Sequence, residues 1–376
     1  MKHYFSLLIT LAMLQLVACG GGGGGGGSGE DCENPPDSIV DDSNINSSLC
    51  GKIFIGNDGY GSWILDLRTG HYSKIPGVEW EDNDDYHHSA EFSAFPAFGG
   101  QEFVETIEEC EYLGSLKYND CIVIHDSSGE IVSSFKVPNQ SYGPAKLSRD
   151  RMFVAVPIKD PTSALNPLRL SIYTRDGVYV DTTSSSHDVT SKGFDWLPDN
   201  RLIYAADRGL YVTTSASAES QLFGTFTEEE GLPDHLAVSP NGLRLALTLK
   251  TFVNLNSTHG TVWVLDLDAT KFIRLAITPD EDDPNTTTDD PVINFPMWSP
   301  DGKWIAVIEG AIAGGTSTLY VVPSDSENTL LTLDGPTDAV PVYSYYSELT
   351  DPRIGRGELT TRFTSLIEEG GYAWIE

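Results

Sequence analysis

The chain has 376 residues, and 23 lysines and arginines stand against 55 aspartates and glutamates, which gives a formal charge of −32. This balance excludes a nucleic-acid-binding protein, because phosphate binding needs clustered cationic side chains. Hydrophobic residues make up 40% of the chain, which is enough to build a folded core. No apolar run reaches the ~18 residues that a membrane-spanning helix needs.

The N-terminal residues have the pattern of an export signal. Lys2 precedes an apolar stretch over residues 4–17, and small residues then lead to Cys19. The run Leu16-Val17-Ala18-Cys19 resembles the lipobox of bacterial lipoproteins. The resemblance implies a signal peptide over residues 1–18, removed by cleavage, and lipid attached to Cys19. An ordinary secretory signal that happens to contain Cys19 is the alternative.

A tether follows this signal. Residues 20–27 are eight consecutive glycines, which have no side chains to pack, and the sequence stays polar to about residue 48. We therefore assign residues 19–50 to a flexible tether, with a coil span of roughly 30 Å, and residues 51–376 to the globular domain. Because Gly20 follows the cysteine, the resemblance to lipoproteins of two-membrane bacteria implies the outer membrane. Whether the protein faces the periplasm or the outside stays open.

The remaining cysteines agree with an exported protein. Cys32, Cys50, Cys110 and Cys121 are an even number in an oxidising compartment, and three pairings are possible. Neighbours in sequence favour disulfides between Cys32 and Cys50 and between Cys110 and Cys121. The alternative, a metal site, lacks the close cysteine spacing and the neighbouring histidines that such sites usually show.

The body of the chain is a repeat. Residues 298–307 align with residues 238–247, and weaker copies occupy residues 196–205 and 147–155. Each copy is an apolar strand, a turn resembling Pro-Asp-Gly, and a second strand, in which proline presets φ, aspartate bonds its own turn and glycine accepts positive φ. A third and a fourth strand follow, for example over residues 260–267 and 272–277, and over residues 317–323 and 329–333.

Four antiparallel strands repeated at this interval predict an all-β fold, a β-propeller of four-stranded blades. The runs Trp298-Ser299-Pro300-Asp301-Gly302 and Val238-Ser239-Pro240-Asn241-Gly242 resemble the TolB-type propeller repeat, a relative in architecture of WD40 repeats. A two-sheet sandwich is the alternative. The chain supplies six blades, and the strand-like residues 371–375 are expected to close the ring by pairing into the first blade. Residues 340–346 could instead begin a seventh blade.

Two clusters could carry chemistry. His87 and His88 with Glu91 would suit a metal-assisted lyase or hydrolase site, although a solvated connector also explains adjacent histidines. Asp280, Glu281, Asp282 and Asp283, with Asp289 and Asp290, offer hard oxygen ligands for Ca²⁺. They lack the spaced pattern of a calcium loop, and such runs often remain hydrated.

The lengths of the loops predict which end of the propeller binds a partner. Turns between first and second strands and between third and fourth strands are short, and they lie at one end of every blade, the short-turn face. Second-to-third loops and connectors lie at the other end, the long-loop face. They hold the long insertions, over residues 78–89, 108–120, 159–167, 250–259 and 279–291. Because binding sites are commonly built from long loops on a rigid scaffold, we expect partner or cation contacts on the long-loop face and none on the other. The alternative is that these loops are tolerated insertions without a function.

These observations favour a non-catalytic, lipid-anchored propeller that binds a protein or an extracellular ligand at the cell envelope. The membrane is then one partner, through the lipid anchor, and a protein on the long-loop face is the other. A propeller enzyme with a site near His87 and His88 is the first alternative, and a structural component of an envelope assembly is the second.

Overall fold

A computed structural model provides the fold. It describes residues 51–55, 63–67, 72–74, 90–93, 102–114, 117–126, 128–138, 141, 143–159, 167–183, 188–213, 219–254, 257–268, 271–277, 292–310, 318–331, 340–342 and 372–375. The predicted signal peptide, the tether and Cys19 lie outside these residues. Within them, no helix is long and apolar enough to cross a membrane.

The described strands form six four-stranded antiparallel sheets. The first three sheets contain, in hydrogen-bonded order, β26 (Tyr372–Ile375), β1 (Lys52–Ile55), β2 (Trp63–Asp66) and β3 (Tyr72–Lys74); β4 (Ala90–Ser93), β5 (Glu102–Gly114), β6 (Lys117–Asp126) and β7 (Ile131–Pro138); and β8 (Lys146–Leu147), β9 (Phe153–Lys159), β10 (Leu168–Thr174) and β11 (Tyr179–Thr182). The last three contain β12 (Val189–Trp196), β13 (Leu202–Ala206), β14 (Gly209–Thr213) and β15 (Ser220–Thr225); β16 (Leu232–Val238), β17 (Arg244–Asn254), β18 (Ser257–Asp266) and β19 (Phe272–Arg274); and β21 (Val292–Trp298), β22 (Trp304–Gly310), β23 (Thr318–Pro323) and β25 (Val340–Val342).

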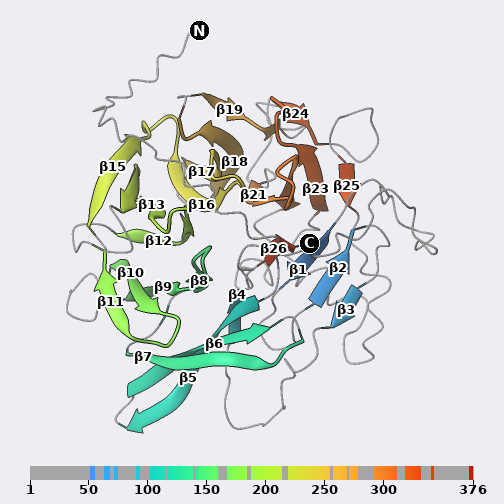
Figure 1. The fold of residues 1–376 in the computed structure, drawn as a ribbon. Helices are drawn as coiled ribbons and strands as arrows, with labels where there is room; N and C mark the ends of the chain where they lie inside the picture. The colour runs from blue at the N-terminus through green and yellow to red at the C-terminus, as the bar shows by residue number, and fades with distance from the viewer. Residues whose placement is uncertain are drawn as a thin grey trace.

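The sheets follow one another in chain order around a common centre (Figure 1). Strands β8, β16, β21 and β26 lie near the centre, and β3, β11, β15 and β19 lie at the rim. The C-terminal strand β26 pairs with β1, with Trp374 opposite Ile53, so the two ends of the domain share one sheet. The predicted pairing of residues 371–375 with the first sheet is therefore present.

Two predicted strands have other partners than expected. Residues 340–342 begin no further sheet, because β25 pairs with β23 and completes the sixth sheet. Residues 329–333 were expected to be that fourth strand, but β24 (Thr329–Leu330) pairs in parallel with β20 (Ala276–Ile277). This short pair links the fifth sheet to the sixth.

Neighbouring sheets pack face to face, because their strands are apolar on both faces. In β17, Leu245, Leu247 and Leu249 are fully buried against the fourth sheet, whereas Ala246 packs against the sixth. Alternate residues of a strand point to opposite faces, so one strand serves two interfaces. Each buried leucine contributes about 1.5–3 kcal/mol relative to an exposed one. Clusters of the same kind join the second sheet to the third and the third to the fourth.

Two cations of the third sheet also tie the inner strands together. The buried Lys146 ammonium donates to the carbonyl of Phe194 and lies 3.5 Å from the carbonyl of Leu236, and these residues belong to the next two sheets. Arg149 donates to the carbonyls of Trp196, at 3.2 Å, and Pro240, at 2.7 Å. Burial lowers the pKa of Lys146 to about 8, although the charge of Asp195 opposes that shift.

The predicted turn chemistry is present in three repeats. The Ser299 hydroxyl donates to the carboxylate of Asp301 at 2.6 Å and accepts the amide of Trp304 at 2.9 Å, while Gly302 adopts a φ of 70°. Equivalent serine bonds form in the turns that begin at Ser239 and Ser148. Successive turns also touch, since a Cβ on Gly242 would lie 2.2 Å from the Pro198 ring.

Two glycines at the same turn position allow a matched stability test. Gly242 and Gly302 have φ values of 71° and 70°, but a Cβ on Gly302 would meet its nearest atom, in Pro240, only at 3.7 Å. We expect Gly302→Ala to cost about 1 kcal/mol from backbone strain alone. Gly242→Ala should cost about 2–4 kcal/mol because the clash with Pro198 adds overpacking. Equal unfolding free energies for the two variants in urea titrations would contradict the contact between the turns.

Candidate functional site

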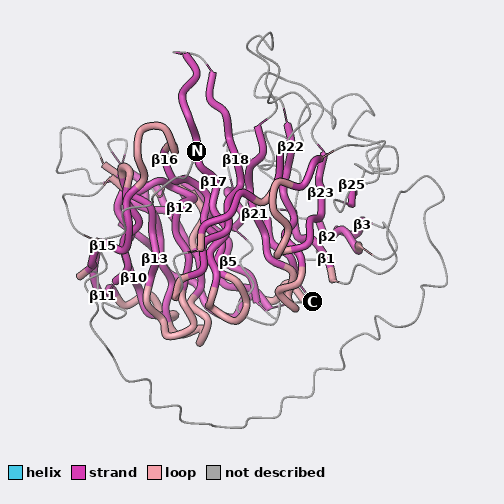
Figure 2. The backbone as a smooth tube through the Cα atoms, turned by 90° about the horizontal axis from the view of Figure 1, so that it is seen from above, coloured by secondary structure: helices cyan, strands magenta, loops and turns pink. Residues whose placement is uncertain are grey.

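Five insertions were predicted to be long loops at one end of the sheets, and those over residues 78–89, 159–167 and 279–291 lie wholly or mostly outside the described residues. Residues 108–120 and 250–259 were expected to be loops, and this is wrong. Strand β5 continues to Gly114 and β6 begins at Lys117, while β17 continues to Asn254 and β18 begins at Ser257. Antiparallel pairing satisfies the backbone of these segments even where the side chains are polar. Figure 2 shows a pair of strands projecting past the other strands.

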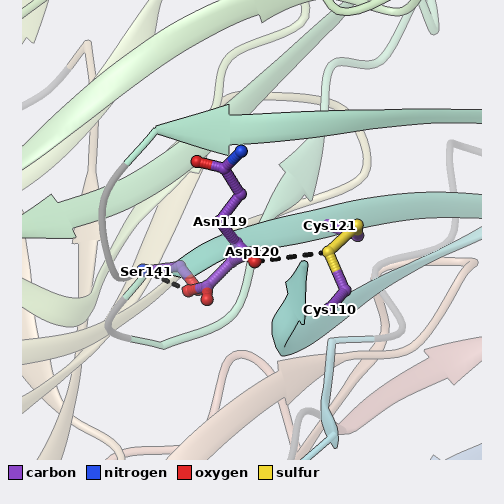
Figure 3. The surroundings of a disulfide bond; sticks show 5 residues. All are labelled: Cys110, Asn119, Asp120, Cys121 and Ser141. Carbon is purple, nitrogen blue, oxygen red and sulfur yellow. Dashed lines mark hydrogen bonds between the residues drawn. A yellow bond between two sulfur atoms is a disulfide. The ribbon is translucent and has the colours of Figure 1, made fainter. Parts of the chain in front are cut away.

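A disulfide fastens the first of these hairpins. Cys110 of β5 and Cys121 of β6 are joined, with their Cα atoms 5.8 Å apart (Figure 3). The sulfur of Cys110 also lies 3.3 Å from the carbonyl oxygen of Asn119, a close contact, because a disulfide sulfur carries no hydrogen to donate. At the base of the hairpin, the carboxylate of Asp120 accepts bonds from the amide and the hydroxyl of Ser141. The second predicted bridge, between Cys32 and Cys50, lies outside the described residues.

Charged side chains gather where the second hairpin leaves the body. Asp234 lies in β16 and Lys250 lies in β17, opposite Leu232 in the strand register. The Asp234 carboxylate accepts from the Lys250 ammonium and lies 3.2 Å from Nδ1 of His235. Asp234 and His235 lie near the start of β16, which follows the connector from the fourth sheet, and Lys250 of β17 pairs with that end of β16. All three residues therefore lie at the long-loop face.

The local backbone explains how two successive residues of β16 reach these partners. The register between β16 and β17 shifts between Pro233 and Leu236, which marks a bulge at Asp234 and His235. Gly231 precedes the strand with a φ of 106°, and a Cβ there would lie 2.7 Å from the carbonyl oxygen of Lys250. Glycine at this position therefore allows the two strands to approach closely.

The electrostatics keep this carboxylate ionised. Burial alone would raise the pKa of Asp234, whose side chain is 14% exposed. The charges and hydrogen bonds of His235 and Lys250 outweigh burial and hold that pKa well below its usual range. The cluster can therefore present a fixed negative charge beside a cation, which suits recognition of a polar ligand.

The sixth sheet completes the surroundings. The His235 ring lies 4.1 Å, between centroids, from the ring of Phe295, a residue of β21 with a φ of 58°. Positive φ is strained for a phenylalanine, and such strain is often found at functional sites. Two buried oxygen atoms, Oγ1 of Thr248 and Oδ1 of Asn294, have no hydrogen-bond partner within the described part of the chain. Thr248 shares one face of β17 with Lys250 because the two are two residues apart.

We call these six residues the Asp234 cluster: Asp234, His235, Thr248, Lys250, Asn294 and Phe295. Sequence reasoning missed them because it searched for catalytic motifs and for runs of carboxylates. The usable signal was an Asp-His pair within an otherwise apolar inner strand, together with a lysine in the next strand. Nothing in the sequence alone shows that β21 contributes the phenylalanine and the asparagine.

A second buried acid–base pair lies in the second sheet. His125 Nε2 lies 2.6 Å from the carboxylate of Glu105, and its Nδ1 lies 3.1 Å from the carbonyl of Gly129. Burial lowers the pKa of His125, but the bond and charge of Glu105 outweigh it, so the pKa is raised overall. The neighbouring Asp126 closes the turn by accepting the amide and hydroxyl of Ser128. This pair lies at the short-turn end of β6, and its contacts hold together strands and a turn of the second sheet.

Most of the site residues predicted from the sequence cannot be compared with the Asp234 cluster. His87, His88 and the acidic residues Asp280, Glu281, Asp282, Asp283, Asp289 and Asp290 fall outside the described residues. Glu91 lies in β4, opposite Thr106 of β5. Among the residues that the structure describes, no group of three or more histidine, cysteine or acidic side chains could hold a metal ion. The proposed Ca²⁺ ligands thus remain a prediction.

The sequence matches no known family model and no curated protein. Similar solved structures include a TolB-like protein from Agrobacterium tumefaciens, at 14% identity over 79% of this chain and 99% of that chain, with a TM-score of 0.47. The periplasmic gluconolactonase of Pseudomonas aeruginosa is 14% identical over 73% of this chain and 80% of its own, with a TM-score of 0.46. The xyloglucanase of Xanthomonas campestris is 11% identical over 79% and 44%, with a TM-score of 0.49.

The chain is thus an all-β protein of antiparallel four-stranded sheets with propeller-like structural neighbours. Those neighbours include enzymes as well as the TolB-like protein. At these identities and TM-scores the likeness carries no argument about activity, because one fold hosts many functions. The function has to be argued from the Asp234 cluster and from the two faces of the molecule.

The Asp234 carboxylate makes a pH-dependent contribution to stability. Because its pKa is lower in the folded than in the unfolded chain, the stabilisation is present above about pH 4 and is lost as the pH falls further. We expect Asp234→Asn to lower the unfolding free energy at pH 7 by about 2 kcal/mol, since Lys250 loses its partner. The difference in unfolding free energy between the wild type and Asp234→Asn should become smaller below pH 4.

Asp199→Asn is the control for this measurement. Asp199 pairs with Arg201 at the surface, at 2.7 Å, and an exposed pair contributes little. Its substitution should change the unfolding free energy at pH 7 by less than about 0.5 kcal/mol. Urea titrations from pH 3 to pH 7 supply both numbers. A gap between wild type and Asp234→Asn that stays constant across this range would exclude the proposed charge network.

Proposed function

We propose that the protein is a non-catalytic, lipid-anchored, six-bladed β-propeller that binds a protein or an extracellular ligand at the outer membrane. Three observations support the proposal. The six described sheets succeed one another around one centre, the last strand shares a sheet with the first, and the N-terminal sequence resembles a lipobox. Lipidation at Cys19 would then hold the propeller at the membrane while leaving it in water.

One observation carries the binding role: in the Asp234 cluster, Oγ1 of Thr248 and Oδ1 of Asn294 are buried and have no hydrogen-bond partner among the described residues. Thr248 is fully buried, yet its hydroxyl has no bond to any described residue. An unsatisfied buried hydroxyl costs about 1–3 kcal/mol, so its presence needs a reason. A bound partner that reaches between β17 and β21 would satisfy it, together with the amide oxygen of Asn294.

The chemistry of the cluster defines the partner. An ionised Asp234 and the carbonyl oxygen of Asn294 are acceptors, whereas Lys250 is already committed to Asp234. A partner with hydrogen-bond donors, such as a protein segment that presents backbone amides or a cationic side chain, complements these acceptors. The net charge of −32 adds long-range attraction for a cationic partner.

Thr248→Val tests this role without removing a structural bond. The change replaces the unpartnered hydroxyl with a methyl group of similar size, so the melting temperature should stay unchanged or rise. We expect capture of the partner from cross-linked cell envelopes to fall at least about tenfold, which corresponds to 1.4 kcal/mol. Quantitative mass spectrometry of the captured proteins provides the measurement.

The matched control is Thr106→Val. Thr106 is also fully buried, and its hydroxyl likewise has no partner among the described residues, but it lies in β5 of the second sheet. Its substitution should leave capture at the wild-type level. Equal capture by the wild type and both variants, or equal loss in both variants, would refute a binding site at the Asp234 cluster.

A further inference from the structure

Large apolar side chains are exposed on the short-turn face, which the sequence suggested to be inert. Ile131 and Val178 are 64% and 63% exposed, and both lie beside turns that join third to fourth strands. We call the following residues the apolar rim: Ile131 and Val132 of the second sheet, and Met152, Val178, Tyr179 and Val180 of the third. Exposed apolar residues are ordinary when scattered, so their grouping is the point to establish.

Contacts between the two sheets bring the rim together. The Ser133 hydroxyl of β7 donates to the carbonyl of Arg175 at 2.9 Å, and the amide of Arg175 donates to the carbonyl of Met152 at 2.9 Å. A Cβ on Gly177 would lie 2.3 Å from that of Phe135, so the turn before Val178 lies directly against β7. The rim is therefore one surface that spans two neighbouring sheets.

The chain enters the domain on this same face. Strand β1 occupies the second place in its sheet, and second strands begin where the short first-to-second turns lie. The carbonyl of Gly51 accepts a hydrogen bond from the amide of Leu67, which directly follows β2, at 3.1 Å. Gly51, the first described residue, therefore lies at the short-turn face, and the predicted tether of residues 19–50 would join the domain there. A coil of that length and composition spans roughly 30 Å, about the size of a small domain.

We propose that the short-turn face rests on the membrane, with the apolar rim in contact with the lipid headgroups and the upper acyl chains. This inference rests on the proposed anchor at Cys19. A lipid at the end of a short tether holds the face from which the tether emerges close to the bilayer. Because the tether keeps the rim near the bilayer, even a small apolar surface is enough to hold the rim in contact with the lipids.

The charges of this face permit the contact. Arg151, Arg201 and Lys303 lie in or directly after its first-to-second turns, and each has an aspartate within the same turn. The turns thus mix both signs, although the whole chain has an excess of 32 negative charges. The third-to-fourth turns beside the rim add the carboxylates of Asp126, Glu130 and Asp176, so the contact suits a zwitterionic bilayer surface rather than an anionic one. In this orientation the Asp234 cluster faces away from the membrane, where a partner can reach it.

Fluorescence quenching by brominated lipids tests the orientation. The full-length lipidated protein is placed on phosphatidylcholine vesicles that contain dibrominated acyl chains, with an environment-sensitive fluorophore on an introduced cysteine. Val178→Cys reports on the rim, and Leu113→Cys is the control, because Leu113 is a similarly exposed apolar residue at the far end of β5. The unsubstituted chain, treated with the same reagent, sets the background.

We expect the bromolipids to quench fluorescence at residue 178 by at least about twofold and to leave residue 113 unquenched. Equal signals at both positions on vesicles that retain the protein would overturn the orientation but leave the anchor intact. Failure of the wild type to remain on vesicles, or retention of a Cys19→Ser variant, would overturn the anchor and the orientation with it. Shielding of residue 178 from aqueous iodide without vesicles would assign the rim to a second copy and reject the membrane contact.

Discussion

The structure depends on one constraint: the sheets are apolar on both faces, so each sheet needs a neighbouring sheet on either side. Strand β17 shows this most simply, since its odd-numbered leucines pack against the fourth sheet and Ala246 packs against the sixth. A sheet of this kind cannot end a stack without exposing a face to water. The chain meets the constraint by curving the row of sheets around a centre. The pairing of β26 with β1 then places the last residues beside the first.

The same constraint separates the two faces of the molecule. The first-to-second turns lie near the centre, where successive sheets converge, and they pack against one another, as Gly242 does against Pro198. These turns have little freedom to vary. At the opposite end, hairpins such as β17–β18 extend past the strands beside them, and bulges in β16 and β21 redirect side chains. That end therefore offers side chains outside the regular packing of the sheets, which is why we place recognition there.

Much of the architecture could be predicted from the sequence because its signals are local. The Ser-Pro-Asp-Gly turn specifies its own conformation through the bonds of Ser299 and Asp301, so its repeats revealed the sheets. The hairpin around Cys110 was misread because its polar side chains resemble those of a loop, whereas its order comes from backbone pairing and the disulfide. Likewise, the parallel pairing of β24 with β20 depends on the approach of two sheets, which no local pattern encodes.

The Asp234 cluster shows the same limit at the level of function. His235 meets Phe295 only because consecutive sheets bring β16 beside β21, across a separation of 60 residues in the chain. Sequence reasoning can identify an acidic residue beside a histidine. It cannot show that His235 and Lys250 offset the effect of burial on the pKa of Asp234, or that the hydroxyl of Thr248 has no hydrogen-bond partner among the described residues. Sites between repeats need the repeats to be placed first.

The closure of the ring is the central claim, and amide hydrogen exchange of the C-terminal strand tests it most directly. If β26 pairs with β1, the amides of residues 372–375 that bond to β1 exchange as slowly as those of β1 itself, and both sets become unprotected together in mild denaturant. Exchange of residues 372–375 at the rate of an unstructured peptide, while β1 stays protected, would contradict the closure.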